Sequence, residues 1–134
     1  MSVNKIKLDI VTPERVTYSE NVNMVIARAV DGDVGILPGH APMIAALDTW
    51  PMRVLRDDGE IKIAISGGFL EARPKKVTIL TNSAELPSEI DVKRAQAAKE
   101  RAESRLKSKE GVDIERAEIA LKKATTRLQA AGKT

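Results

Sequence analysis

The chain of 134 residues contains no cysteine, and aromatic residues make up only 2% of it. Without cysteine it can form no disulfide, no thiolate metal site and no cysteine nucleophile. Any core must therefore be built from aliphatic side chains and methionine. No apolar run reaches the roughly 18 residues that a membrane-spanning helix needs. Residues 1–7 also lack the long apolar stretch of a signal peptide. We therefore expect a soluble, cytoplasmic protein without direct membrane insertion.

The excess of positive charge lies in the last third of the chain. Residues 1–84 hold 10 basic and 10 acidic residues, whereas residues 85–134 hold 12 and 9. Such an excess is either the solvated surface of helices or a surface for an anion or an acidic partner. A nucleic-acid-binding surface is not favoured, because acids are interleaved with the basic residues and aromatic stacking platforms are missing.

Residues 1–84 have the pattern of short strands. Apolar and polar side chains alternate over residues 6–10, and an apolar run over residues 22–30 predicts a further strand. Asp57-Asp58-Gly59 and residues 73–76 each separate two apolar runs and predict hairpin turns. Short strands at such close spacing indicate an antiparallel sandwich or a flattened barrel.

Beyond residue 84 the periodicity becomes helical. Ser88 is expected to cap a first helix over residues 88–107, with Asp91 completing a weak capping box. Residues 108–111 break this helix, and the glycine that ends them suits a left-handed cap. A second helix is predicted over residues 113–130. We therefore predict two domains, residues 1–84 and residues 85–134.

The two helices should fold back on each other as an antiparallel hairpin with a seam rich in alanine. The expected seam residues are Ala95, Ala98, Ala102 and Leu106 in the first helix, and Ile114, Ala117, Leu121, Ala124 and Leu128 in the second. At about 0.8 kcal/mol per buried CH₂-sized group, each alanine contact is weak. Such a hairpin either opens or remains a permanently docked tail, and the periodicity leaves both alternatives open. Glu118 and Lys122 are spaced for an ion pair within the second helix.

Few residues carry a signature of catalysis. His40 is the single histidine, and without cysteine it cannot build a zinc site by itself. The Gly-x-Ser-x-Gly pattern of a nucleophile elbow does not occur. Gly67-Gly68 lacks the lysine of a phosphate-binding loop and predicts a strand bend or bulge. We expect neither a metal site nor catalysis by this chain alone.

Several motifs together resemble one family, the epsilon subunit of F-type ATP synthases. Residues 32–42, GDVGILPGHAP, resemble its G-[ED]-x-G-I-L-P-G-H-x-P segment, and residues 65–71, ISGGFLE, resemble its S-G-G-x-L-E segment. Residues 9–13 end on the V-T-P that closes its opening strand. Residues 90–95, IDVKRA, are similar to its I-D-x-x-R-A motif, and residues 116–121, RAEIAL, to R-A-E-x-A-L. The resemblance covers nearly the whole chain, in the family's order.

The resemblance implies an N-terminal antiparallel β-sandwich that docks on the rotor. A C-terminal antiparallel two-helix hairpin follows it as a regulatory domain. The resemblance also implies a non-catalytic central-stalk subunit of a proton-translocating ATP synthase, on the cytoplasmic face of the bacterial membrane. The implied partners are the gamma subunit, the ring of c subunits and, when the tail extends, the alpha/beta catalytic head. The extended tail inhibits ATP hydrolysis in relatives. Asp31, Gly32 and Asp33 match a segment facing the c ring, and His40 lies in the neighbouring loop as a further candidate contact.

In some relatives the folded tail binds ATP, which makes ATP a candidate regulatory ligand, although no cofactor is required. Ile90, Asp91, Arg94 and Ala95 match that motif, and Glu85, Arg101 and Arg127 fall at further matching positions. Lys123 stands where those relatives carry arginine, and lysine keeps the charge but loses the planar fork of donors. The alternative is a purely structural coupling subunit whose tail stays folded and senses no nucleotide.

Overall fold

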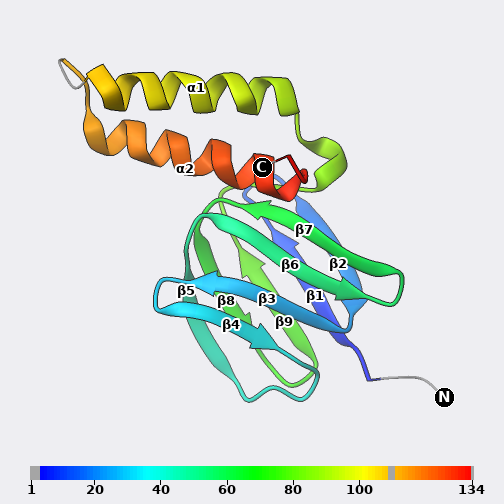
Figure 1. Cartoon of the computed structure of the whole chain (residues 1–134). Helices are drawn as coiled ribbons and strands as arrows, with labels where there is room; N and C mark the ends of the chain where they lie inside the picture. Colours follow the sequence, from blue (N-terminus) through cyan, green and yellow to red (C-terminus); the bar gives the residue numbers. More distant parts are fainter. Residues whose placement is uncertain (1–3, 109–110, 134) are drawn as a thin grey trace.

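The computed structural model describes residues 4–108 and 111–133, which form a β-rich body and a helical tail (Figure 1). The described strands are β1 Ile6–Val11, β2 Val16–Val22, β3 Met24–Ala29, β4 Gly32–Ile36, β5 Met43–Leu47, β6 Trp50–Arg56, β7 Gly59–Ile65, β8 Gly68–Ala72, β9 Lys76–Leu80 and β10 Ala84–Glu85. A 3-10 helix, η1, spans Pro87–Glu89, and the tail consists of α1 Val92–Ser108 and α2 Ile114–Ala130. The prediction of a sandwich followed by a two-helix hairpin is confirmed.

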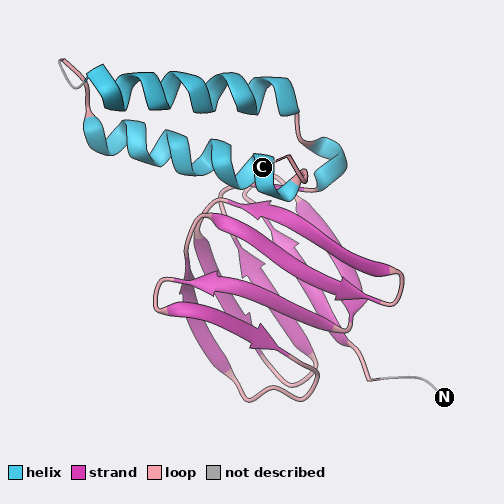
Figure 2. Ribbon diagram, in the orientation of Figure 1, coloured by secondary structure: helices cyan, strands magenta, loops and turns pink. Residues whose placement is uncertain are grey.

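The strands form two facing layers (Figure 2). One layer has the order β10-β7-β6-β3, with β4 beside β3, and the other has the order β5-β8-β9-β1-β2. Strand β3 joins them, because it pairs with β6 over Met24–Ile26 and with β5 through Ala29 and Leu47. The pairing is antiparallel as predicted, with one exception: β1 and β9 run parallel. Parallel neighbours require a long connection, which here is most of the body.

The core follows from the alternation seen in the sequence. Ile6, Leu8 and Ile10 on β1 are fully buried, as the period-2 pattern predicts. The predicted strand over residues 22–30 is wrong in one respect, because β2 ends at Val22 and β3 begins at Met24. The backbone N–H of the residue between them turns away to the Leu55 carbonyl of β6, at 2.8 Å, and this ends β2.

The predicted turns are confirmed. Gly59 in the β6–β7 turn has φ +123°, and Gly67 and Gly68, which lead into β8, have φ +64° and +110°. A Cβ atom on Gly68 would press on the Leu80 carbonyl oxygen and lie 2.9 Å from the Cα of Thr81. Glycine is thus required where β8 passes β9, both for its backbone conformation and for space.

The first helix starts later than predicted. Asp91, rather than Ser88, caps α1, because its Oδ1 accepts the N–H of Arg94 at 3.0 Å. Ser88 instead lies within η1, and Ile90 after it is extended, with ψ 124°. Proline favours the first turn of η1, so a separate short turn forms before the main helix begins. Asp113 caps α2 in the same way, accepting the N–H of Arg116 at 3.0 Å.

Most of the predicted seam is confirmed. The residues buried between the helices are Ala95, Ala102, Ala117, Ala124 and Leu128. Ile114 was expected there but is 37% exposed, because it lies in the first turn of α2, next to the break that joins the two helices. Gly111 has φ +62°, the left-handed conformation predicted for it. The break was predicted to include Lys109 and Glu110, which lie outside the described residues.

The tail rests on the body through a small apolar contact. Ala64 of β7, Ile90 and Ala130 of α2 form a cluster separate from the core of the sandwich, with Val92 and Ala131 packed against it. Strand β10 pairs with β7 and crosses the predicted domain boundary, so the sheet continues to Glu85. Within the described ranges, the structure contains no helix that is both long and apolar enough to cross a membrane.

Candidate functional site

A cavity of about 400 Å³ opens where the tail meets the body. Its lining residues are Glu85, Asp91, Arg94, Ala95, Ala98, Arg101 and Arg127. They come from β10, from the cap of α1, from α1 itself and from α2. Three arginines and two carboxylates give the lining a net charge of +1. The volume lies within the range of roughly 300–1,000 Å³ that is usual for small-molecule sites.

Both carboxylates of this cavity already have partners. Oε1 of Glu85 accepts a hydrogen bond from Nε of Arg127 at 2.5 Å, and Asp91 caps α1. Arg94 and Arg101 have no ion-pair partner among the side chains that the structure describes. Two guanidinium groups are therefore available to an anionic ligand, and guanidinium binds phosphate in a bidentate manner.

The start of α1 adds to this positive potential. Asp91 and Arg94, which line the cavity, lie at the first turn of the helix. The N-terminal end of a helix carries a partial positive charge and unpaired N–H groups. Together with the arginines, it makes the cavity suitable for a phosphate group. Among the described side chains, no group of three His, Cys, Asp or Glu could hold a metal ion.

Six of the eight residues predicted for a nucleotide site line this one cavity: Glu85, Asp91, Arg94, Ala95, Arg101 and Arg127. The other two do not. Ile90 is 8% exposed and packs in the cluster between tail and body. Lys123 points to solvent from α2. Ala98 also lines the cavity, although it was expected only as a seam residue.

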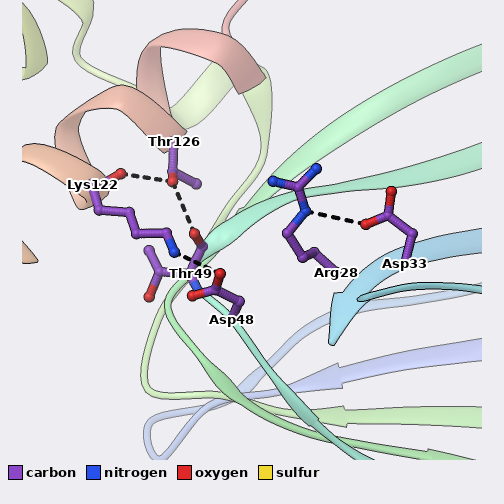
Figure 3. Close-up of polar contacts among 6 residues, drawn as sticks. All are labelled: Arg28, Asp33, Asp48, Thr49, Lys122 and Thr126. Atoms are coloured by element: carbon purple, nitrogen blue, oxygen red, sulfur yellow. Dashed lines mark hydrogen bonds and ion pairs between the residues drawn. The ribbon is translucent and has the colours of Figure 1, made fainter. Parts of the chain in front are cut away.

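A second polar contact holds α2 to the body (Figure 3). Nζ of Lys122 lies 2.5 Å from Oδ2 of Asp48, so the predicted pair with Glu118 is wrong. The hydroxyl of Thr126 donates to the Lys122 carbonyl at 2.7 Å and lies 3.4 Å from the Thr49 carbonyl. The Lys122 side chain points to the body because Asp48 is held close to α2, whereas Glu118 is exposed to solvent.

The predicted interface residues lie at the two ends of β4. Asp31 lies in the turn from β3 into β4, and Gly32 and Asp33 begin β4, where Nε of Arg28 donates to Asp33 at 3.1 Å. His40 lies in the loop beyond the other end of β4, where its Nδ1 is 2.7 Å from the Ala41 carbonyl oxygen. Four steps of about 3.3 Å along the strand separate the two loops by roughly 13 Å. A standard interface buries about 800 Å² of each partner, so both loops can belong to one contact surface, and both stay candidate contacts.

An exposed apolar face was not anticipated from the sequence. Ile44, Phe69 and Leu80 are 72%, 57% and 52% exposed. They lie on the neighbouring strands β5, β8 and β9, where Phe69 is directly paired with Leu80 and with Ala46. Shallow hollows of about 500 and 540 Å³ flank them. One feature of the sequence could have indicated this face. Phe69 is the only phenylalanine of the chain, and it lies on the side of β8 opposite to the buried Leu70 and Ala72.

Comparison with known proteins identifies the families to which the body and the tail are similar. Residues 5–87 match the family model described as ATP synthase, Delta/Epsilon chain, beta-sandwich domain, and residues 88–132 match the one described as ATP synthase, Delta/Epsilon chain, long alpha-helix domain. The chain belongs to the ATP synthase delta/epsilon chain family. The resemblance drawn from the motifs is thereby confirmed.

Bacterial relatives are about half identical to this chain over the aligned residues. The ATP synthase epsilon chain of Brevibacillus brevis is 53% identical over 108 residues, which are 80% of this chain and 82% of that protein. The ATP synthase epsilon chain of Alkalihalophilus pseudofirmus is 51% identical over 106 residues, 79% of this chain and 80% of that protein.

Solved structures give the same fold. A chain of the Euglena gracilis mitochondrial ATP synthase, from a structure of OSCP, F1 and the c-ring in rotational state 1, aligns with a TM-score of 0.81 at 27% identity. The alignment covers 96% of this chain and 82% of that one. A chain of the central stalk and c-ring of the Tetrahymena thermophila enzyme aligns at TM-score 0.55 and 14% identity over the whole of both chains, which supports the fold alone.

Proposed function

We propose that this chain is a non-catalytic rotor subunit of the central stalk of a bacterial F-type ATP synthase, peripheral to the cytoplasmic face of the membrane. It couples rotation of the proton-driven c ring to the catalytic head. Family membership and the relatives named ATP synthase epsilon chain support this role. The Euglena gracilis chain with the same fold belongs to an assembly that contains F1 and the c-ring.

The body supplies the docking surfaces in this proposal. The exposed face of Ile44, Phe69 and Leu80 binds the gamma subunit, because an apolar patch of this kind is typical of a protein interface. The segment of Asp31, Gly32 and Asp33 contacts the c ring. His40, at the other end of β4, is a separate contact with a rotor subunit.

The cavity between tail and body binds ATP in the folded state. The observation that carries this proposal is the meeting of three arginines from two helices, Arg94, Arg101 and Arg127, in one cavity. The triphosphate would be shared between α1 and α2 and would hold the alanine seam closed. At about 100 times its Kd, ATP would add about 2.7 kcal/mol to the folded form, provided that it does not bind the open form.

Without ligand, the weakly packed hairpin opens, extends toward the alpha/beta head and inhibits ATP hydrolysis. The described tail contacts the body through Val92, Ala130, Ala131 and three polar side chains, so its release leaves the core of the sandwich intact. The folded tail is therefore the permissive state, and ATP favours it.

Reconstitution of the catalytic subcomplex tests the regulatory role. Three forms are compared: the full chain, a chain ending after Ser88, and a chain with Thr49→Cys and Thr126→Cys joined by a thiol cross-link. The truncated and cross-linked forms should both show higher ATPase activity than the full chain, and reduction of the cross-link should restore inhibition. Equal activity of all three forms would exclude an inhibitory tail.

The alternative is a permanently folded tail that only supports the body. It is favoured by the position of Lys123, which lies in solvent and not in the cavity, and by the contact of Lys122 with Asp48. Under this alternative the cross-link changes nothing, and ATP binds no better to the full chain than to Arg94→Ala.

A further inference from the structure

The tail is held to the body by polar contacts at two separate places on α2. Arg127 binds Glu85 inside the cavity, and Lys122 binds Asp48 outside it. The apolar cluster between tail and body is small, and three of its five members are alanines. Since such small side chains bury little area, the polar contacts contribute a large share of the docking free energy.

Asp48 is held in position by contacts that do not involve Lys122. Its Oδ1 accepts the N–H of Thr49 at 2.8 Å, and its own N–H donates to the carbonyl of Arg28 at 2.9 Å. Oδ2 is left facing α2, where Nζ of Lys122 meets it (Figure 3). An acceptor that is already ordered loses little entropy when the ion pair forms, so this pair stabilises more than a pair of two mobile side chains.

The two contacts differ in how they respond to an anionic ligand. Arg127 gives only its Nε to Glu85, so its other N–H donors can bind a phosphate in the cavity while this contact persists, and the ligand adds to the docking at this place. Asp48 and Lys122 do not line the cavity, so the ligand leaves their pair unchanged. Docking of the tail thus has one component that depends on the ligand and one that does not.

We propose that the Lys122–Asp48 ion pair, supported by Thr126 against the Thr49 carbonyl, is a nucleotide-independent latch that sets how often the tail leaves the body. The inference rests on the proposed function in one respect: a latch matters only if the tail is released. Both side chains are partly exposed, 42% for Lys122 and 32% for Asp48. Breaking the pair should therefore raise the undocked population roughly two- to fivefold.

A cysteine reporter in the full chain measures this population. The chain has no native cysteine, so Ala64→Cys introduces a single thiol, at a site that is 5% exposed and covered by the tail. The rate of its reaction with a thiol reagent, without nucleotide, is proportional to the undocked fraction. Val54→Cys, in the fully buried core, should react far more slowly, which separates undocking from unfolding.

Lys122→Met and Asp48→Asn should each accelerate labelling of the Ala64→Cys thiol about two- to fivefold. The double variant should label no faster than the faster single variant, because both changes remove the same pair. Exchange of the charges, Asp48→Lys with Lys122→Asp, should return the rate toward that of the parent. Lys107→Met, which removes an exposed tail lysine at the far end of α1, serves as the matched control and should leave the rate unchanged.

Single variants that label at the parent rate would overturn the latch, as would a double variant whose acceleration is the product of the two singles. This outcome is distinguishable from failure of the proposed function. If labelling accelerates while the truncated and cross-linked chains leave ATPase activity unchanged, the latch stands and the inhibitory role falls. If labelling does not respond but ATPase activity does, the latch is wrong and inhibition stands.

Discussion

Arg127 of α2 donates from its Nε to Oε1 of Glu85 in β10, at 2.5 Å, and the two side chains form part of the wall of the cavity. One guanidinium thus joins the tail to the body and faces the space proposed for the phosphates. Because this contact is only partly exposed, 37% and 31% for the two side chains, its loss should affect both docking and ligand binding.

We expect Arg127→Ala to lower the affinity for ATP about tenfold or more, because a charge-assisted hydrogen bond contributes about 1.5–3 kcal/mol and 1.4 kcal/mol is a factor of ten. The same variant should accelerate labelling of the Ala64→Cys thiol without nucleotide. Calorimetric titration measures the first effect and labelling kinetics the second. An unchanged affinity would remove Arg127 from the ligand site even if docking weakened.

Arg94→Ala should separate the two effects. Arg94 lines the cavity but makes no ion pair with the body within the described ranges. The affinity for ATP should fall about tenfold, by the same energy as above, while the labelling rate without nucleotide stays at that of the parent. Arg105→Ala, an exposed arginine of α1 that is not part of the lining, is the matched control. Equal loss of affinity in both variants would indicate a general charge effect rather than a site.

The sequence was sufficient for the parts of the structure that depend on local patterns. Alternation on β1 predicted which side chains enter the core, and Asp57-Asp58-Gly59 predicted the β6–β7 turn. Residues 90–95 are contiguous, so most of one wall of the cavity could be read from a single motif. The family resemblance supplied Arg127 from the second helix, which no local rule places beside Glu85.

Contacts between segments far apart in the chain could not be predicted in this way. Lys122 had a suitable partner one turn away in Glu118, yet it pairs with Asp48, which is 74 residues distant. The i,i+4 spacing rule considers only neighbours on the same helix, whereas packing of α2 against the body brings Lys122 to Asp48. Likewise, the sequence predicted Ser88 as the cap of α1, but Ile90 is extended in the structure, so the helix begins only after it and Asp91 is the cap.

Phe69→Asp should weaken binding to purified gamma subunit by about tenfold or more, because truncation of a central aromatic anchor commonly costs about 2 kcal/mol. The thermal stability of the free chain should change little, since the side chain is 57% exposed. Val16→Asp, at a residue of β2 that is 58% exposed and outside the apolar face, is the control. If both variants bind gamma equally well, the docking face lies elsewhere.

Gly68→Ala should destabilise the body by about 3 kcal/mol or more, because positive φ and a steric conflict act together. The added methyl group would meet the Leu80 carbonyl and the backbone of Thr81. Gly59→Ala is a matched comparison, since φ is +123° there but nothing lies within 4 Å of the added atom. It should cost only about 1–2 kcal/mol. Urea unfolding of both variants measures the difference, and equal losses would show that backbone conformation alone requires Gly68.

Asp9 should make the stability of the body dependent on pH. The Ser19 hydroxyl, 2.6 Å from its Oδ1, and the Lys76 ammonium, 3.1 Å from its Oδ2, lower the pKa of the Asp9 carboxyl below its ordinary value. A lowered pKa in the folded state means that the unfolded chain binds the proton more readily. The contribution is therefore complete above about pH 5 and disappears as the pH falls through the folded pKa, below the unfolded value of about 3.9.

Asp9→Asn should accordingly cost about 1 kcal/mol at pH 7, the usual size for a partly buried, charge-assisted contact. The difference from the parent chain should shrink as the carboxyl becomes protonated. Urea titrations at pH 7 and at pH 2.5 measure it, and Glu14→Gln, at an exposed position, controls for the general loss of a negative charge. A difference that keeps its full size at pH 2.5 would mean that the substituted amide disturbs the packing of β1 between β2 and β9, and that ionisation of the carboxyl is not what stabilises these strands.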